Sequence, residues 1–210
     1  MLKVIASLAL ALILCTACSQ PLSVRHQDEL RGHQTPDRAT VRAQLAQHRA
    51  QKIVRLTRYA QRGEFPHNFD KSTSAHIFRD GAGRLCAVAN LVQQDGRDDL
   101  VEATVREHNN LAISDVNDGP LLDWILASGL TQEELARIQL PAPPLVRREK
   151  IRTPAPRLVA DNLSDEARMN QMVVKHFEQV RRELEANTEE SLDLATDRFV
   201  TLRAMAARSY

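Results

Sequence analysis

Hydrophobic residues recur at three- and four-residue intervals along much of the chain between residues 37 and 140, which is typical of short amphipathic helices. The first helix is expected over about residues 37–62, with Asp37 or Thr35 as its N-cap and Gly63 as a left-handed stop. Its apolar stripe consists of Val41, Leu45, Ile53, Leu56 and Ala60. The polar residues His67, Asn68 and Asp70 follow and predict a solvated loop.

The segment from His76 to Val92 is the predicted centre of this region. A short apolar run at 76–79 favours a strand, and Asp80-Gly-Ala-Gly83 predicts a tight turn because glycine and aspartate tolerate positive φ. The spacing of Leu85, Val88, Ala89 and Val92 then predicts a helix that ends near Gly96. We expect the rest of residues 36–140 to pack around this helix.

Three further helices are predicted downstream. Asp98 begins one that ends near Asn109-Asn110, and Asp118 with Pro120 begins a strongly apolar one over Leu121–Leu126. Thr131-Gln-Glu-Glu134 is a capping box, which accounts for Glu133 and Glu134 without any catalytic role. The apolar run 111–113 either pairs with the strand at 76–79 or forms an extended connection.

Residues 141–162 are rich in proline and arginine and predict a semi-extended linker. Two amphipathic stripes follow within residues 163–208, the second opening at Thr188, and they predict an αα-hairpin closed by one apolar seam. Two helices alone bury little, so we expect this unit to dock on the main domain or to dimerise. The predicted fold class is therefore mainly α: a small helical domain at 37–140 with at most a short two-stranded β element, plus the C-terminal hairpin.

The first residues predict export. Lys3 followed by an apolar run from Val4 to Leu14 has the pattern of a signal peptide, covering residues 1–17. Leu14-Cys-Thr-Ala-Cys18 resembles a bacterial lipobox, which implies cleavage before Cys18 and acylation of that cysteine. Ordinary signal-peptidase cleavage near Ala17 is the alternative. Residues 18–36 would then be a tether, and Ser19, by resemblance to Gram-negative lipoproteins, implies the outer membrane.

Charge and cysteine content narrow the possible functions. The net charge of the whole chain is +1, which gives no electrostatic reason to expect a nucleic-acid partner. Of the three cysteines, Cys15 leaves with the signal and Cys18 is the lipidation site, so Cys86 alone remains as a thiol. No cofactor motif is present, because Gly81-x-Gly83-x-x-Cys86 lacks the strand, the third small residue and the later acid of a dinucleotide loop.

Cys86 is the one candidate nucleophile. A thiol at a helix N-terminus has a lowered pKa, and His76 or His108 could act as its base, with Asn109 or Asn110 orienting the imidazole. The favoured interpretation is instead a buried small hydrophobic residue, because no peptidase signature surrounds this cysteine. A metal site formed by His67, Asp70 and His76 is a third, less favoured hypothesis, and the sequence predicts no metal.

Residues 80–91, Asn109-Asn110, 122–125 and 129–139 together resemble a group of uncharacterised exported bacterial proteins. The shared pattern is approximately D-x-x-G-x-x-C-A-x-x-x-L, N-N and W-L-x-x-x-G-L-T-x-x-E-x-A-x-I-Q, and it covers about residues 55–140. The resemblance implies no activity. The sequence therefore predicts a membrane-anchored envelope lipoprotein with a non-enzymatic interaction or scaffolding role. Its expected partners are the membrane, which it contacts through the lipid anchor, and a protein of unknown identity. A thiol-dependent hydrolase or acyltransferase using Cys86 is the alternative.

Overall fold

The computed structural model describes residues 37–68, 73–142 and 165–208, which belong to one compact unit spanning Pro36–Tyr210. The predicted signal peptide, the predicted lipidation site Cys18, the predicted tether and most of the predicted linker lie outside the described residues. The helices are α2 (Arg38–Arg62), α3 (Ala87–Gln94), α4 (Asp98–His108), the 3₁₀ helix η1 (Ile113–Asp115), α5 (Gly119–Ala127), α6 (Gln132–Ile138), α7 (Asp165–Ala186) and α8 (Thr188–Arg208). The predicted mainly α fold class is confirmed.

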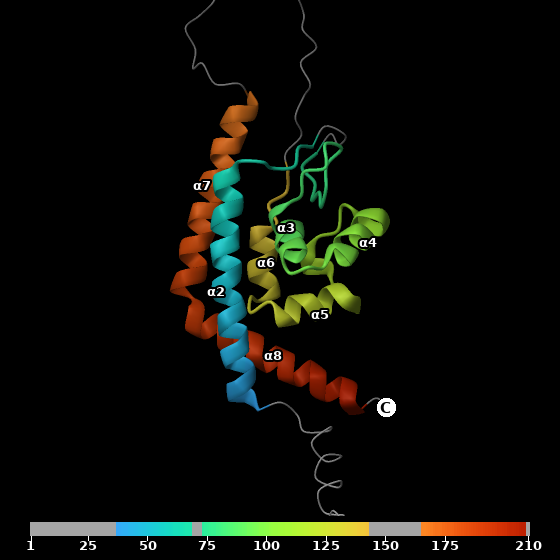
Figure 1. Cartoon of the computed structure of the whole chain (residues 1–210), viewed down its shortest axis with the longest axis vertical. Helices are drawn as coiled ribbons and strands as arrows, with labels where there is room; N and C mark the ends of the chain where they lie inside the picture. Colours follow the sequence, from blue (N-terminus) through green and yellow to red (C-terminus); the bar gives the residue numbers. More distant parts are fainter. Residues whose placement is uncertain (1–36, 69–72, 143–164, 209–210) are drawn as a thin grey trace, which may run out of the picture. The chain divides into compact units, whose positions relative to one another are not determined.

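The long helix α2 is the element on which the others assemble. Figure 1 shows α2 and α7 running side by side in opposite directions, with α8 crossing the first turns of α2. The short helices α3 to α6 lie together beside α2, and α3 packs directly on it. One hydrophobic cluster joins them, with buried side chains that include Leu56, Phe78, Val88, Leu91, Ile113, Ile125, Leu135, Ile138, Phe177 and Leu184.

Several helix ends fall where the sequence predicts them. Asp37 caps α2 by accepting the Thr40 N–H at 3.0 Å, and Gly63 ends the helix with φ 69°. The capping box of α6 is complete: the Glu134 N–H donates to Thr131 Oγ1 at 3.1 Å, and the Thr131 N–H donates to Glu134 Oε2 at 2.8 Å. These ends are set by neighbouring residues alone, so local sequence suffices to predict them.

Extended backbone is limited. Among the described residues, isolated bridges pair Arg79 with Leu85 and Ala75 with Ala142. The first closes the predicted Gly turn, where the Cys86 N–H donates to Phe78 O at 2.9 Å. Extended pairing therefore stays within the predicted limit of at most a short two-stranded element, and it consists of isolated bridges in the described residues.

Residues 111–113 do not pair with the strand at 76–79. Ile113 begins η1, and the buried Gln139 side chain bonds the backbone on both sides of this run. Its Oε1 accepts the Ile113 N–H and its Nε2 donates to Leu111 O, each at 2.8 Å. A side-chain amide offers both N–H donors and an acceptor oxygen, so it replaces the missing strand partner.

The two C-terminal helices form, but the predicted seam between them is wrong. A single residue, Asn187, separates α7 from α8, and both helices direct their main contacts to α2. Leu192 and Ala195 of α8 pack on Val41 and Leu45 of α2 in a second small core cluster. The expected docking on the main domain is confirmed by the packing of both helices on α2.

Thr188 is the first residue of α8, as predicted. Its hydroxyl donates to Leu184 O at 3.0 Å, and so satisfies a carbonyl at the end of α7 instead of capping the start of α8. This bond and the Ser191 N–H to Asn187 O bond at 3.0 Å hold the bend between the two helices.

A buried ion pair connects α2 to α6 and to the α7–α8 bend. Arg49, 1% exposed, donates from Nη1 to Glu134 Oε2 at 2.8 Å and from Nη2 to Glu134 Oε1 at 2.7 Å. The same Nη2 donates to Leu184 O at 2.7 Å, and the Ser191 hydroxyl donates to Glu134 Oε1 at 2.8 Å. One guanidinium and one carboxylate therefore contact four helices.

The charge state of Glu134 follows from these contacts. Burial raises the pKa of this carboxyl, but hydrogen bonds from Arg49 and from the Thr131 N–H outweigh burial, and the net pKa lies below the ordinary 4.5. A carboxyl whose folded-state pKa is lowered stabilises the fold above its unfolded pKa, and this stabilisation is lost as the pH falls through the folded pKa.

Replacing Glu134 should therefore change both stability and its pH dependence. We expect Glu134→Gln to lower the free energy of unfolding at pH 7 by about 3 kcal/mol, because Arg49 is left buried without its counter-charge. Between about pH 5 and 3 the variant should lose less further stability than the wild type. Urea unfolding monitored by circular dichroism at several pH values measures this. The matched control is Glu133→Gln, on the exposed side of the same helix, and an equal loss in the control would contradict the role of the buried pair.

Gly129 is a second constraint on the same contact. Its φ is 79°, and a Cβ built on it would lie 2.1 Å from Leu45 O and 2.6 Å from Arg49 N. Gly83 has a similar φ of 83°, but a Cβ there would meet nothing within 4 Å.

The two glycines make a matched pair of variants. Gly83→Ala should cost only the ~1–2 kcal/mol of a left-handed alanine. Gly129→Ala should cost clearly more, because the backbone of α2 must also move away. Equilibrium denaturation compares the two variants, and equal losses would show that the approach of residue 129 to α2 is not restrictive.

Candidate functional site

Cys86 lies at the N-cap of α3 and is 5% exposed. Its Sγ accepts the Ala89 N–H at 3.4 Å, so the thiol takes the place that a serine or aspartate side chain usually occupies at a helix start. The neighbouring Leu85 carbonyl is held by the Tyr59 hydroxyl, which donates to it at 2.8 Å. The predicted position of Cys86 at the helix start is correct.

The expected lowering of the thiol pKa is wrong. Burial raises the pKa of Cys86 to about 11, and the N–H groups of Ala89 and Val88 oppose this only in part. The first turn of α3 does lower the pKa of the thiol as predicted, but desolvation of the thiolate raises that pKa by more. Cys86 is thus a protonated thiol at neutral pH.

The proposed partners of Cys86 either form hydrogen bonds with other groups or line a different cleft. His108 is exposed at the end of α4 and lines a different cleft, formed by α4 and the start of α5. The Asn109 amide bonds the backbone of Arg79 twice, accepting its N–H at 3.0 Å and donating to its carbonyl at 2.9 Å. Asn110 Nδ2 donates to the backbone carbonyl of His76 at 2.6 Å, not to its ring.

His76 itself is not arranged as a base. Its Nδ1 is buried and has no hydrogen-bond partner among the described residues. Because neither imidazole shares a recorded hydrogen bond with Sγ, the structure does not bring the three candidate catalytic residues into a catalytic arrangement.

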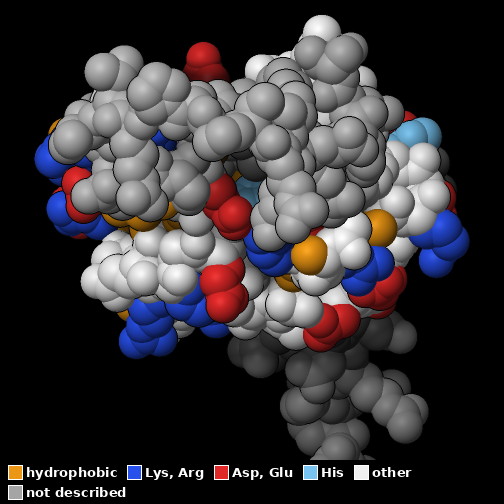
Figure 2. Space-filling view, turned by 90° about the horizontal axis from the view of Figure 1, so that it is seen from above, with side chains coloured by type: hydrophobic (Ala, Val, Ile, Leu, Met, Phe, Trp, Pro, Cys, Tyr) orange, Lys and Arg blue, Asp and Glu red, His pale blue; other side chains and the backbone are white. Residues whose placement is uncertain are grey.

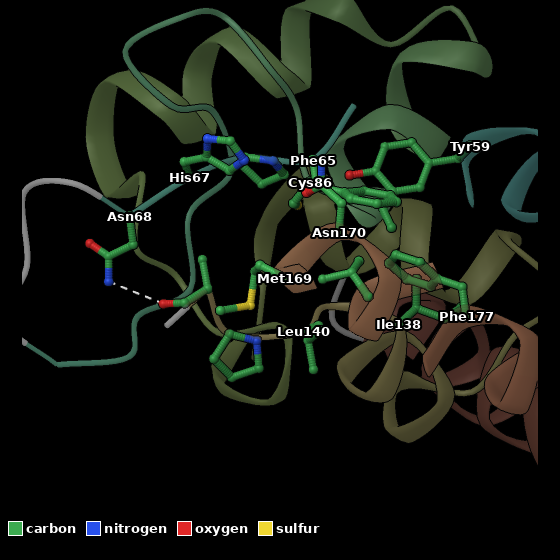
Figure 3. Close-up of a pocket in the computed structure, with 15 residues that line it drawn as sticks. Tyr59, Phe65, His67, Asn68, Cys86, Ile138, Leu140, Met169, Asn170 and Phe177 are labelled. Atoms are coloured by element: carbon green, nitrogen blue, oxygen red, sulfur yellow. Dashed lines mark hydrogen bonds between the residues drawn. The ribbon is translucent and has the colours of Figure 1, made fainter. Parts of the chain in front are cut away.

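Cys86 does border a small cavity between α2, α3, α6 and α7 (Figure 3). Its volume is about 40 Å³, which is room for a few water molecules and far below the ~300 Å³ of small ligand pockets. The lining is chiefly apolar and includes Tyr59, Phe65, Ile138, Leu140, Met169, Val173 and Phe177. The cavity suits packing better than substrate binding.

The loop at His67 and Asn68 differs from the predicted solvated loop. His67 is 6% and Asn68 is 1% exposed. Asn68 Nδ2 donates to Thr73 O at 2.8 Å and to Ala142 O at 3.1 Å, and Figure 3 draws a hydrogen bond from this labelled amide. The amide closes this loop onto the start of the linker, and a sequence pattern does not report such a long-range bond.

Asp80 organises the turn next to that loop. Its Oδ1 accepts the N–H groups of Ala82 and Arg84, each at 2.9 Å, and its Oδ2 accepts the His67 N–H at 3.0 Å and Arg84 Nε at 2.8 Å. Burial raises the pKa of Asp80, but these hydrogen bonds outweigh it and the net pKa is lowered. Arg84 Nη2 also donates to His67 Nδ1 at 2.8 Å. His67 is therefore engaged as an acceptor.

Within the described residues, no group of three or more His, Cys, Asp or Glu side chains is placed to hold a metal ion. This finding covers His67 and His76 of the hypothetical metal site, whereas the third residue, Asp70, lies outside the described residues.

A second carboxylate that sequence analysis missed is Asp95 at the end of α3. Lys52 Nζ lies 2.7 Å from its Oδ2, Trp124 Nε1 donates to Oδ2 at 2.7 Å, and Arg55 pairs with Oδ1. Burial raises its pKa, and these donors lower it further than burial raises it. The site joins α2, α3 and α5, and its full coordination by protein donors marks it as structural.

The visible surface carries mixed charge. On the face in Figure 2, basic and acidic side chains surround small, separate hydrophobic patches. The exposed large hydrophobic residues include Val54, Met172, Leu194 and Met205, which are spread over α2, α7 and α8.

Comparisons with protein-family models, with curated proteins and with solved structures find no match for this chain. Among the described residues, no helix has the length and apolar character needed to cross a bilayer.

The buried thiol predicts slow alkylation. At pH 8 a pKa near 11, in place of the ordinary 9.0, leaves about a hundredfold less thiolate. We expect iodoacetamide to modify native Cys86 at least that much more slowly than Cys86 in urea, as followed by intact-protein mass spectrometry. Equal rates in the two states would restore the nucleophile hypothesis.

Proposed function

We propose that this chain is a lipid-anchored protein of the bacterial envelope, attached to the membrane through acylated Cys18, whose helical body serves a non-enzymatic interaction or scaffolding role. The proposal places it in the outer membrane, on the basis of Ser19 after the cysteine. The observation that carries the non-enzymatic part is the state of Cys86, a buried thiol with a raised pKa.

The organisation of the fold supports this role. The tether at residues 18–36 leads directly into α2, and α2 is the helix to which α3, α7 and α8 attach. A pull on the anchor would therefore act on the central helix and not on a peripheral one. Multiple acyl chains on Cys18 would hold the protein stably, whereas a single chain would not.

The resemblance to exported bacterial proteins of unassigned activity is part of the same proposal. It supports export and the unity of residues 55–140, and it adds no reaction. The alternative of a thiol-dependent hydrolase or acyltransferase lacks a favouring observation, because the nucleophile is protonated and its proposed bases are not joined to it.

The anchor can be tested by mass spectrometry of the mature N-terminus. We expect the wild-type protein from a Gram-negative host to begin at Cys18 and to carry diacylglycerol plus an N-linked acyl chain, and to partition into detergent. Cys18→Ser should abolish both properties. Cys86→Ser is the matched control, because it changes a cysteine far from the lipobox and should leave lipidation intact. An unmodified wild-type N-terminus near residue 18 would refute the anchor.

A further inference from the structure

An open cleft lies between the end of α2, the Gly turn and α3. It is lined by Arg62, Glu64, Arg79, Arg84, Asn90 and Gln93, with Tyr59, Leu85 and residues 82–83 of the turn forming the rest of its wall. Three of these side chains are arginines, and Glu64 is the single carboxylate among the lining residues. The cleft is therefore lined mainly by hydrogen-bond donors.

Two of the three arginines are already neutralised. Arg79 makes a two-pronged ion pair with Glu102, with Nη2 to Oε2 at 2.8 Å, and Arg84 is paired with Asp80 at 2.7 Å. Arg62 has no carboxylate within ion-pair distance among the described residues. It is thus the cation of the cleft that still lacks a counter-charge.

Arg62 is nevertheless held in place. Its guanidinium carbon lies 5.6 Å from the centre of the Tyr59 ring, and its Nη2 donates to Asn90 Oδ1 at 3.1 Å. A guanidinium carries five N–H donors, so this single recorded bond leaves most of them open to a ligand. A positioned arginine loses less conformational entropy on binding than a mobile one.

Asn90 provides the second donor. Its side chain is 9% exposed, and its Oδ1 accepts from Arg62 and from Gln94 Nε2, the latter at 2.5 Å. Arginine cannot accept a hydrogen bond, so Oδ1 must be the atom that faces Arg62. Nδ2 is therefore the other amide atom, and it has no hydrogen-bond partner among the described residues. Nδ2 is not among the fully buried unpaired atoms, so this donor is accessible from the cleft, where water or a ligand can satisfy it.

We propose that this cleft binds a small ligand through a carboxylate group, with Arg62 and Asn90 Nδ2 as its donors. A carboxylate is planar and accepts two coplanar N–H bonds, which matches one guanidinium edge beside one amide. Tyr59 and Leu85 supply an apolar wall for the carbon skeleton of the ligand, whereas Glu64 weakens binding by repulsion. This site goes beyond the proposed anchoring role and does not depend on lipidation of Cys18.

The test follows the Asn90 side-chain amide by nuclear magnetic resonance in the full ¹⁵N-labelled chain in detergent micelles. The probes are N-acetylalanine, its uncharged amide N-acetylalaninamide, and inorganic phosphate, all at pH 7, where the carboxylate is ionised. We expect N-acetylalanine to shift the Asn90 Nδ2 signals with a dissociation constant in the ~millimolar range, as suits so small a ligand. The amide should cause no shift.

The decisive variant is Asn90→Asp, which keeps the oxygen that accepts from Arg62 and Gln94 but replaces the free donor with a second oxygen. Its unfolding should stay close to wild type, while N-acetylalanine affinity, measured from the backbone signals of residues 82–85, falls at least about tenfold. Gln47→Glu adds the same charge on an exposed turn of α2 outside the cleft and should leave affinity unchanged. Glu64→Gln should increase affinity.

Unchanged affinity in Asn90→Asp would overturn the site, as would equal shifts from the acid and its amide. Shifts from phosphate but not from N-acetylalanine would overturn the carboxylate assignment. A failed Cys18 experiment with a positive result here would remove the anchor alone, so the two proposals fail separately.

Discussion

The buried ion pair between Arg49 and Glu134 is the contact on which the arrangement of the helices depends. The pair lies where α2, α6 and the α7–α8 bend meet, and further hydrogen bonds join it to the carbonyls of Gly129 and Leu184 and to the hydroxyl of Ser191. Only Arg49 Nε has no hydrogen-bond partner among the buried atoms of this pair in the described residues. Two charges removed from water are tolerated only when each is the partner of the other, so any displacement of one helix is opposed by desolvation of both groups. The close approach of Gly129 to α2 places α5 and α6 against the same point.

Side-chain amides complete what the helices leave unsatisfied. The connections between the short helices are partly buried, and buried backbone groups need partners. Asn68, Asn109, Gln132 and Gln139 provide them, since each amide donates to or accepts from loop backbone that no strand covers. The fold therefore satisfies these irregular segments with side-chain amides and little β structure in the described residues. Asn90 differs from these four, because part of its amide remains unpaired at a cleft.

Local features were predictable from sequence because neighbouring residues decide them. The cap at Asp37, the stop at Gly63, the Gly turn after Arg79 and the capping box at Thr131 each involve groups within a few residues. Apolar periodicity likewise predicted the mainly α class. The position of Cys86 at a helix start was predictable for the same reason, although its protonation state was not.

Tertiary structure decided the rest, because burial and long-range partners have no signal in spacing. The sequence by itself determined where helices begin and end and which faces are apolar. Only the folded chain decided that Cys86 is desolvated, that α7 and α8 pack on α2 in preference to each other, and that Arg62 remains without a counter-charge among the residues described. The physical reason is that solvation and pairing of charges depend on groups 30 to 135 residues apart, as with Arg79 and Asn109 or Arg49 and Leu184.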